Sequence, residues 1–525
     1  MRFMFIGDVT ITPCQPSTLR ILPEARANDT GARHDDACGG TPSGRGSIVR
    51  ACHSRSLLLV PIALFTFTMM VVGTAMAKPA TFCVNPGGTA GCFAKIQDAV
   101  DATGKSGSVI NVAVGAYFDN VTIPKTRVTI NADPDTAIFG VTTDPILTVA
   151  AGAKVTINNL QFQDTFTKSS CIESRGSLTM NGIAVFLCSG MRGAGIHQIG
   201  GKLTILNSVI DGNEATENGG CLAMEGGKLT LQDADFTSCI AHGDGGAMWL
   251  SNTRVNITRD NNDTDPKVQI KSNHASGSGG GIFASGGKIS INAVVLSDNV
   301  ATAGNGGGIE SSSPLTITNS LIENNISLGD GGGILAQAPG KLGVINSSII
   351  GNHSNVSAGG GIAAETTFNL LNDTLFGNRS GQDGGAIFAL GSGKIGSLTI
   401  DGNHSVKGNG GGIDIASGSV KITNTIMALN TAPMAFAQDC GGSFLSQGFN
   451  LIFDTTGCTI SGQTGNNITG QDPNLGATQP FDVKIVQEPN MGSPVLGAGG
   501  HCPKTDEVFH SRPKTRCDIG AIESP

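Results

Sequence analysis

The sequence is poor in aromatic and charged residues. One tryptophan and one tyrosine occur among 525 residues, so there are few of the flat side chains on which sugars or bases stack. Charged residues make up 14% of the chain, well below the usual ~25%. The net charge is −8, and acidic and basic residues are dispersed along the chain without a basic patch. The sequence therefore predicts no nucleic-acid partner.

The first 77 residues differ from the rest. Basic residues precede an apolar run over 57–73, and a small-residue AxA site ends at Ala77, which predicts a secretory signal peptide cleaved after Ala77. The polar residues before this run favour an overextended start, with Val49 as a candidate initiator. The alternative is a retained membrane anchor, because the 21 residues of 57–77 suffice to span a bilayer. The prediction is a secreted or bacterial cell-surface protein.

The cysteine count supports export. Thirteen cysteines are present, of which three lie in the leader, and the remaining ten are an even number that fits disulfides in an exported chain. The candidate pairs closest in sequence are Cys83 with Cys92, Cys440 with Cys458, and Cys502 with Cys517. Buried free thiols are an alternative for Cys171, Cys188, Cys221 and Cys239.

Glycine, in contrast, is abundant at 76 residues and recurs in one phrase: NGGGI at 305–309, DGGGI at 330–334 and NGGGI at 409–413. The apolar residue that ends each phrase aligns ten positions at spacings of 24 to 34 residues: Ile172, Ile196, Leu222, Met248, Ile282, Ile309, Ile334, Ile362, Ile387 and Ile413. A nearly fixed period of this size is typical of a solenoid. Alternating stretches such as LTIT at 315–318 predict β-strands within each period.

The repeat predicts an all-β fold, a single right-handed parallel β-helix of about 24–28 residues per coil. Each coil is expected to contain three short strands. Glycine permits φ > 0 and a close backbone approach, so we interpret the glycine phrase as a corner of each coil.

Two rows of polar residues accompany the repeat. The first stands nine or ten residues before most aligned positions and is asparagine: Asn213, Asn273, Asn299, Asn325, Asn352, Asn378, Asn403 and Asn430. The second stands four residues before them: Asn218, Asp244, Ser278, Asn305, Asp330, Ala358, Asp383 and Asn409. Asx side chains bond their own backbone in turns, so we interpret the second row as turn residues without a catalytic role.

The GG[AG]I phrase, paired with an asparagine three residues after an apolar one, resembles the repeats of polymorphic outer membrane proteins and of pectin lyase-like β-helices generally. The segment 92–123 is similar to the first coils of many secreted β-helices, in which a short helix, here near 96–102, caps the core. The end of the chain resembles the choice-of-anchor Q group of bacterial surface proteins, in DCGG at 439–442, GFNLI at 448–452, DPNLG at 472–476, SPVLGAG at 493–499 and RPKTRCDIGAIE at 512–523.

The resemblance implies a secreted or surface-displayed bacterial β-helix without an assigned activity. Together with the signal-peptide pattern, it divides the chain into a leader over 1–77, a β-helix over 78–475 and a capping or anchor-like segment over 476–525. The C-terminal region shows no set of amphipathic strands, so no membrane-spanning barrel of its own is expected.

Catalytic residues are not evident. Asp244, Asp330 and Asp383 are three and then two coils apart, roughly 14 and 10 Å at ~4.8 Å per coil. Only the second gap approaches the carboxylate separation of inverting glycosidases, so structural turn residues are the preferred interpretation. Three histidines directly follow members of the asparagine row: His274, His353 and His404. They are three and then two coils apart and cannot share one metal ion, so they are interpreted as solvated turn residues.

The 34-residue interval after Met248 is the strongest local anomaly. It contains three acidic residues, Asp260, Asp263 and Asp265. Their carboxylates would suit calcium, which is the one candidate cofactor that the sequence indicates. Trp249, Arg254 and Arg259 would contact an acidic sugar by stacking and ion pairing. The alternative interpretation is a solvated loop.

These observations predict a non-enzymatic adhesion or envelope-associated protein whose partner is an extracellular glycan or surface protein. The alternative is a carbohydrate-active β-helix enzyme, a polysaccharide lyase or hydrolase.

Overall fold

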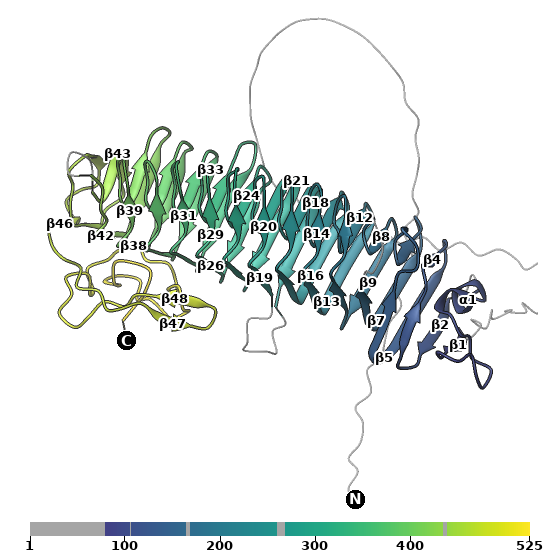
Figure 1. Cartoon of the computed structure of the whole chain (residues 1–525). Coiled ribbons are helices and arrows are strands. Elements are labelled where there is room, and N and C mark those ends of the chain that lie inside the picture. Colours follow the sequence, from purple (N-terminus) through teal and green to yellow (C-terminus); the bar gives the residue numbers. More distant parts are fainter. Residues whose placement is uncertain (1–78, 105–106, 164–168, 260–267, 434–437, 525) are drawn as a thin grey trace, which may run out of the picture. The chain divides into compact units, whose positions relative to one another are not determined.

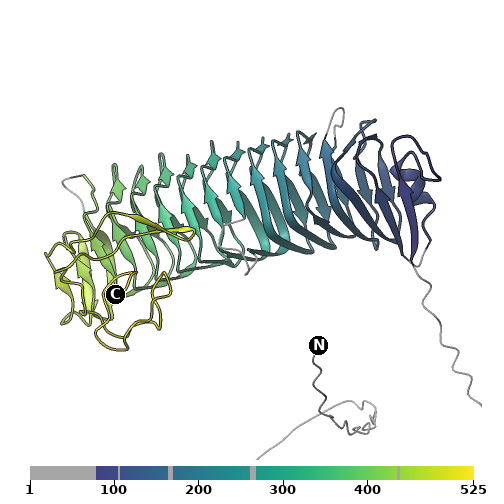
Figure 2. The ribbon, with the colours of Figure 1, turned by 90° about the horizontal axis from the view of Figure 1, so that it is seen from below.

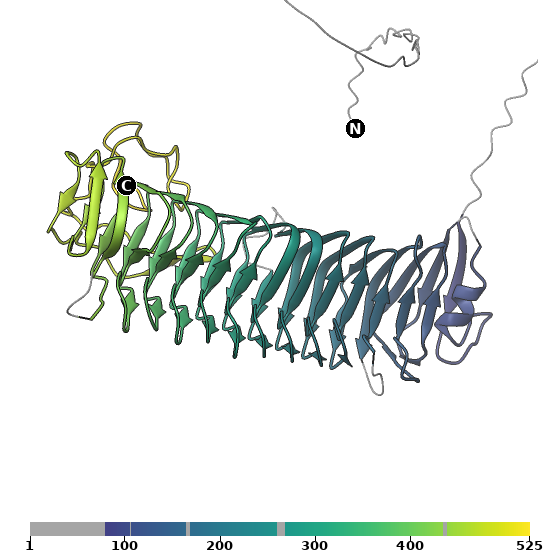
Figure 3. The ribbon, with the colours of Figure 1, turned by 90° about the horizontal axis from the view of Figure 1, so that it is seen from above.

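The computed structural model describes residues 79–104, 107–163, 169–259, 268–433 and 438–524, which all belong to the unit Ala75–Pro525. These residues form a right-handed parallel β-helix, in which coils stack from the helix α1 (Ile96–Asp101) at one end to strands β45 (Cys458–Gly462) and β46 (Ile468–Thr469) at the other (Figures 1 and 3). The fold class predicted from the repeat is confirmed. No helix among the described residues is long and apolar enough to cross a membrane. The predicted signal peptide and its cleavage site lie outside the described residues.

A typical coil contains four strands, one more than the sequence predicts. The coil that begins at Ile309 has β24 (Ile309–Ser311), β25 (Leu315–Thr318), β26 (Leu321–Glu323) and β27 (Ile326–Ser327). Each pairs in parallel with its equivalent in the next coil, as β24 does with β28 (Ile334–Ala336). The fourth strand has only two residues, too few for a hydrophobic alternation to appear in the sequence.

The other strands of the coils belong to the same four sets. The first strands include β4 (Val121–Ile123), β6 (Leu147–Val149), β8 (Ile172–Ser174), β12 (Ile196–Ile199), β15 (Leu222–Glu225), β32 (Ile362–Ala364), β36 (Ile387–Ala389) and β40 (Ile413–Ile415). The second strands include β1 (Ala80–Val84), β2 (Ser108–Val112), β9 (Ser177–Asn181), β29 (Lys341–Ile345), β33 (Thr367–Leu371), β37 (Gly393–Gly396), β41 (Val420–Thr423) and β45 (Cys458–Gly462).

The third strands include β3 (Ala116–Phe118), β10 (Ala184–Phe186), β19 (Gln269–Lys271), β22 (Val295–Ser297), β30 (Ser348–Ile350), β34 (Thr374–Phe376), β38 (Thr399–Asp401), β42 (Ile426–Ala428), β44 (Leu451–Ile452) and β46 (Ile468–Thr469). The fourth strands include β11 (Ser189–Gly190), β14 (Glu214–Ala215), β17 (Ile240–Ala241), β20 (His274–Ala275), β23 (Val300–Ala301), β31 (His353–Ser354), β35 (Arg379–Ser380) and β39 (His404–Ser405).

Seven long strands occupy two positions of a coil. Second and third positions are joined in β5 (Arg127–Phe139), β7 (Lys154–Gln163), β13 (Lys202–Asp211) and β16 (Lys228–Thr237). First and second positions are joined in β18 (Met248–Thr258), β21 (Ile282–Asn292) and β43 (Cys440–Ser446).

The corners of a coil need backbone with positive φ. In the coil of β24 these are Asn319 (φ 53°), Asn324 (φ 52°) and Gly331 (φ 69°). Glycine adopts this conformation freely and asparagine tolerates it, whereas other side chains are strained there. The prediction that the glycine phrase forms a corner is therefore confirmed.

The first polar row forms a ladder in the core. Nδ2 of Asn325 donates to Oδ1 of Asn352 at 2.9 Å and to the carbonyl of Leu296 at 3.0 Å, and Oδ1 of Asn325 accepts from the backbone N–H and Nδ2 of Asn299. The pattern repeats up to Asn430, whose donors end on Oδ1 of Asp439. Each asparagine thus ties two neighbouring coils together.

The second polar row also bonds between coils, which corrects the expectation that its members bond their own turns. Oδ1 of Asn218 accepts from the backbone N–H of Asp244 at 2.8 Å, and Oδ1 of Asp244 accepts from that of Ser278 at 2.8 Å. The stacking of coils places a backbone N–H of the next coil within hydrogen-bonding distance of each side-chain oxygen. The N–H groups of the glycine turn itself already donate to the next coil, as Gly306 does to Asp330.

The helix α1 (Ile96–Asp101) packs on the first coils through the buried side chains of Ile96, Ala99 and Val100, as the predicted helix near 96–102 requires. Five disulfides are present, including the three predicted pairs. Cysteines 171 and 188, and 221 and 239, also form disulfides, so the free-thiol alternative is wrong. Five disulfides are typical of a chain that matures in an oxidising, extracellular compartment.

The C-terminal segment, 476–524, lies along the flank formed by the third strands of the last coils (Figures 1 and 2). It contains an antiparallel hairpin of β47 (Gln479–Phe481) and β48 (Lys484–Val486). The backbone N–H of Ile485 donates to Oγ of Ser348 at 3.1 Å, and that of Ala521 donates to Oγ1 of Thr399 at 3.0 Å. These contacts place it beside the coils; its role as an anchor stays a prediction.

Candidate ligand-binding face

Basic residues that are dispersed in the sequence meet on one face of the β-helix. Lys228 pairs in register with Lys202 on one side and with Arg254 on the other, and Arg254 pairs with Lys288. The complete row runs along the first residues of the second strands, interrupted by Ser177 and Pro314: Arg127, Lys154, Lys202, Lys228, Arg254, Lys288 and Lys341. The inference from the sequence that the chain lacks a basic patch is therefore wrong.

Strand alternation sets which residues of the second strands face outward. In β16, Lys228 is exposed, Leu229 and Leu231 are buried, and Thr230 and Gln232 are half-buried. The same alternation in neighbouring coils gives three rows of outward side chains, at the first, third and fifth residues of the second strands. We call them the outer row, which consists mainly of cations, the middle row, which is mostly threonine, and the inner row, which is rich in amides. Lys394 and Lys421 stand in the middle row of the later coils.

We call the outward residues of these stretches the cationic face: 127–131, 154–158, 177–181, 202–206, 228–232, 254–258, 288–292, 314–318, 341–345, 367–371, 392–396 and 419–423. None of these stretches contains aspartate or glutamate, although the whole chain has a net charge of −8. The acidic residues therefore lie on the other faces and in the corners. The surface is segregated by charge.

The cations of this face form no ion pairs with the described residues. Basic residues elsewhere do: Arg192 contacts Glu217 at 2.7 Å, and Arg259 contacts Asp482 at 2.8 Å. No described carboxylate thus competes with an external anion for the guanidinium and ammonium groups of the face.

A shallow hollow of about 330 Å³ lies in the outer row, lined by Lys228, Arg254 and Lys288 together with Asn252 and two glycines. Gly227 (φ 79°) and Gly287 (φ 82°) supply no side chains there, and a Cβ on either would overlap backbone of the preceding coil. The glycines thus allow the close stacking of the coils that carry the three cations.

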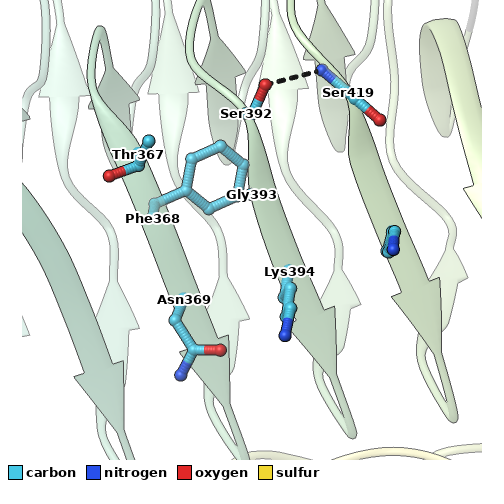
Figure 4. A pocket seen from close by; sticks show the side chains of 8 residues that line it. Thr367, Phe368, Asn369, Ser392, Gly393, Lys394 and Ser419 are labelled. Carbon is cyan, nitrogen blue, oxygen red and sulfur yellow. Dashed lines mark hydrogen bonds between the residues drawn. The ribbon is translucent and has the colours of Figure 1, made fainter. Parts of the chain in front are cut away.

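A second hollow of about 470 Å³ lies on the same face in later coils (Figure 4). The ring of Phe368 extends over Gly393, which leaves room for it, and Lys394 and Lys421 line the wall. Oγ of Ser392 accepts a hydrogen bond from the backbone N–H of Ser419 at 3.0 Å, which fixes the rim. Both hollows are therefore lined by cations together with glycine.

The structure separates the three predicted ligand residues. Trp249 points outward from the first-strand part of β18, and its ring lies 5.8 Å from the guanidinium of Arg192. Arg254 lies beyond the corner at Asn252, on the cationic face. Arg259 makes two hydrogen bonds to the carboxylate of Asp482, at 2.8 and 3.1 Å. The proposed joint site of the three therefore does not form, and Arg254 belongs to a different surface.

The candidate calcium ligands Asp260, Asp263 and Asp265 lie outside the described residues. Calcium binding therefore stays a prediction. Across the described part of the chain, no group of three or more histidine, cysteine, aspartate or glutamate residues is placed to hold a metal ion.

The acids of the second polar row serve the stacking of coils. Oδ1 of Asp330 accepts from the backbone N–H of Ala358 at 2.8 Å, and Oδ1 of Asp383 accepts from that of Asn409 at 2.7 Å. The histidines lie half-buried in the fourth strands, which corrects their interpretation as solvated turn residues: His274, His353 and His404. Burial and the nearby Arg379 lower the pKa of His353.

The carboxyl groups with the most strongly raised pKa values lie where the C-terminal segment contacts the coils, which the sequence did not indicate. Burial raises the pKa of Glu507 to about 8 and that of Asp373 well above its usual range. Glu507 accepts hydrogen bonds from Oγ of Ser348 at 2.8 Å and from Oγ1 of Thr374 at 2.6 Å. Both carboxyl groups are inaccessible to a substrate, so they serve the docking of the segment rather than catalysis.

Asp414 differs because it keeps 7% of its surface exposed. It points outward from the first strand β40, and burial together with the neighbouring Asp383 raises the pKa of Asp414 to about 6.

No protein-family model matches the chain, and no curated protein matches it. Two solved structures are similar. The crystal structure of pectate lyase Pel9A is 15% identical, covering 86% of this chain and 98% of its own, with a TM-score of 0.33. The Geobacillus virus E2 ORF18 structure is 12% identical, covering 77% and 63%, with a TM-score of 0.17. Likenesses this distant do not bear on activity or ligand.

Proposed function

We propose that this protein is a non-enzymatic, extracellular β-helix that binds a surface or matrix partner through its cationic face, in adhesion or in association with a cell envelope. The observation that carries the proposal is the segregation of charge: twelve successive second strands present cations, hydroxyls and amides without one carboxylate. A long regular face of one sign suits the binding of an extended partner. Catalysis would instead need a few converging groups in a cleft.

An extracellular location is supported by the five disulfides and by the predicted signal peptide. The resemblance of the repeats to polymorphic outer membrane proteins, and of the C-terminal region to the choice-of-anchor Q group, supports display on a bacterial surface.

The test is binding of the purified, disulfide-bonded protein to an array of extracellular glycans and matrix proteins. A face variant carries Lys228→Gln, Arg254→Gln and Lys288→Gln. A matched control removes three exposed cations elsewhere, and so changes the net charge equally: Lys125→Gln, Lys407→Gln and Lys514→Gln.

We expect the wild type and the control to bind at least one component of the array, and the face variant to bind it several-fold more weakly. Binding to nothing on the array, or equal binding by both variants, contradicts the proposal.

A carbohydrate-active enzyme is the second candidate, and the partly exposed Asp414 favours it, since a carboxyl with a pKa near 6 can act as a general acid or base near neutral pH. If polysaccharides incubated with the protein release reducing or unsaturated ends, and Asp414→Asn abolishes the release while binding persists, the enzyme assignment replaces the non-enzymatic one.

A further inference from the structure

The ligand class can be derived from the spacing and chemistry of the cationic face. We infer that the face binds a linear acidic polysaccharide that lies along the axis of the β-helix, across successive second strands. The inference rests on the proposed binding function and adds the chemical identity and direction of the ligand.

The spacing favours a linear polymer over a compact ligand. Seven cations occupy one outer row that spans eight coil steps from Arg127 to Lys341, or about 38 Å at ~4.8 Å per step. A small anion would contact two or three of them. A polymer with repeated negative charges can contact most of the row.

The register also costs stability, which indicates selection for binding. Lys202, Lys228, Arg254 and Lys288 stand directly beside one another in four consecutive coils. Like charges placed opposite one another destabilise a sheet, and these have no carboxylate partners among the described residues. A polyanion would relieve the repulsion and release the counterions of both partners.

The neighbouring rows favour a polysaccharide over a nucleic acid. The middle row carries threonine in five consecutive coils, and the hydroxyl groups of Thr129, Thr156, Thr179 and Thr230 suit sugar hydroxyls, whereas Oγ1 of Thr204 is buried. The inner row adds amides, which suit the same partners. The twelve stretches contain a single aromatic residue, Phe368 in the later hollow, whereas proteins that bind single-stranded nucleic acids stack successive bases on aromatic side chains.

The hollow between Lys228, Arg254 and Lys288 supplies a place for one acidic sugar unit. Its volume of about 330 Å³ is that of a small-ligand pocket, and its walls carry three cations. The planar guanidinium of Arg254 can donate two parallel hydrogen bonds to one carboxylate or sulfate. We therefore expect Arg254 to contribute most of the specificity at this point.

The test measures affinity for a carboxylated polysaccharide, a sulfated one, the carboxyl-reduced neutral form of the first, single-stranded DNA and duplex DNA. Wild type, the face variant and the matched control are compared at about 50 and about 200 mM salt, because a polyanion that displaces counterions binds more weakly as salt rises. Circular dichroism and urea unfolding confirm that the variants remain folded. Oligomers of increasing length of the bound polymer are measured separately.

We expect both acidic polysaccharides to bind and the neutral form not to. The face variant should lose at least tenfold in affinity and show a weaker salt dependence, and the control should change less than twofold. Affinity should rise with oligomer length well beyond the few units that one hollow could hold. A difference between the carboxylated and sulfated polymers identifies the acidic group.

Three results overturn the inference: equal binding of the neutral form, tighter binding of either DNA, or no gain in affinity with length. The first and third leave the proposed binding function standing if the face variant still loses affinity for an array component. Failure to bind any component of the array refutes both.

Discussion

Asn325→Ala tests the claim that the asparagine ladder holds the coils together. The side chain is fully buried and makes four hydrogen bonds, two donated by Nδ2 and two accepted by Oδ1. Alanine removes all four. The carbonyl of Leu296 and the backbone N–H of Asn299 lose these partners inside the core, whereas Nδ2 of Asn299 still donates to Ile270.

The size of the effect follows from those two backbone groups. Each buried group left without its partner costs about 1–3 kcal/mol, and the void left by the amide adds about 1 kcal/mol. The free energy of unfolding should therefore fall by about 3–7 kcal/mol. Each coil contacts only its neighbours, so the loss should be concentrated in the coils around Asn325.

The assay combines urea unfolding followed by circular dichroism with hydrogen exchange measured by mass spectrometry. Exchange should accelerate over 296–352 and stay unchanged in the coils near α1. The control is Asn369→Ala, an exposed asparagine on β33 that makes no side-chain hydrogen bond among the described residues, for which a change below about 0.5 kcal/mol is expected. Equal effects of the two substitutions would refute the reasoning.

Three further predictions concern the buried carboxyl, a disulfide and a glycine corner. Because the pKa of Glu507 is raised from 4.5 to about 8, its contribution to stability is full below about pH 4.5 and is lost as the pH rises through about 8, on the order of 5 kcal/mol. Urea unfolding at acidic and alkaline pH should show this loss in the wild type and much less of it in Glu507→Gln. Replacing Cys221 and Cys239 together with alanine, which opens a disulfide of sequence separation 18, should lower the free energy of unfolding by about 3 kcal/mol; an unchanged urea midpoint would count against it. Gly306→Ala should destabilise by about 2–4 kcal/mol, because φ is 57° and the added Cβ would overlap the carbonyl of Ile309, whereas thermal unfolding of Gly343→Ala, where the nearest atom is 3.9 Å away, should resemble the wild type.

The candidate face could not be predicted from the sequence because the strand register does not follow residue counts. Lys202 stands six residues after the aligned Ile196, whereas Lys341 stands seven after Ile334. Corners absorb these insertions, and backbone pairing then restores the row. A count along the chain therefore shows dispersed cations. The recurring pattern of a cation, an apolar residue and threonine, as in KLT at 202–204 and 228–230, was the available signal.

Trp249, Arg254 and Arg259 illustrate the opposite error. Proximity in sequence suggested one site, but positive φ at Asn252 turns the chain between Trp249 and Arg254. Arg259 is bound by Asp482, 223 residues away. Neighbours on a β-helix are set by the stacking of coils, about 26 residues apart, and by segments that fold back.

By itself, the sequence determined the fold class and the positions of the glycine corners and the asparagine row. Local physics suffices for these, since the period, strand alternation and backbone preferences are all written within one coil. The tertiary structure alone decided which side chains share a face and where the C-terminal segment docks. It also decided that the side chains of both polar rows form hydrogen bonds with the neighbouring coil. Glu507 meets Thr374 across 133 residues, a contact that depends on how complete coils stack and fold against one another.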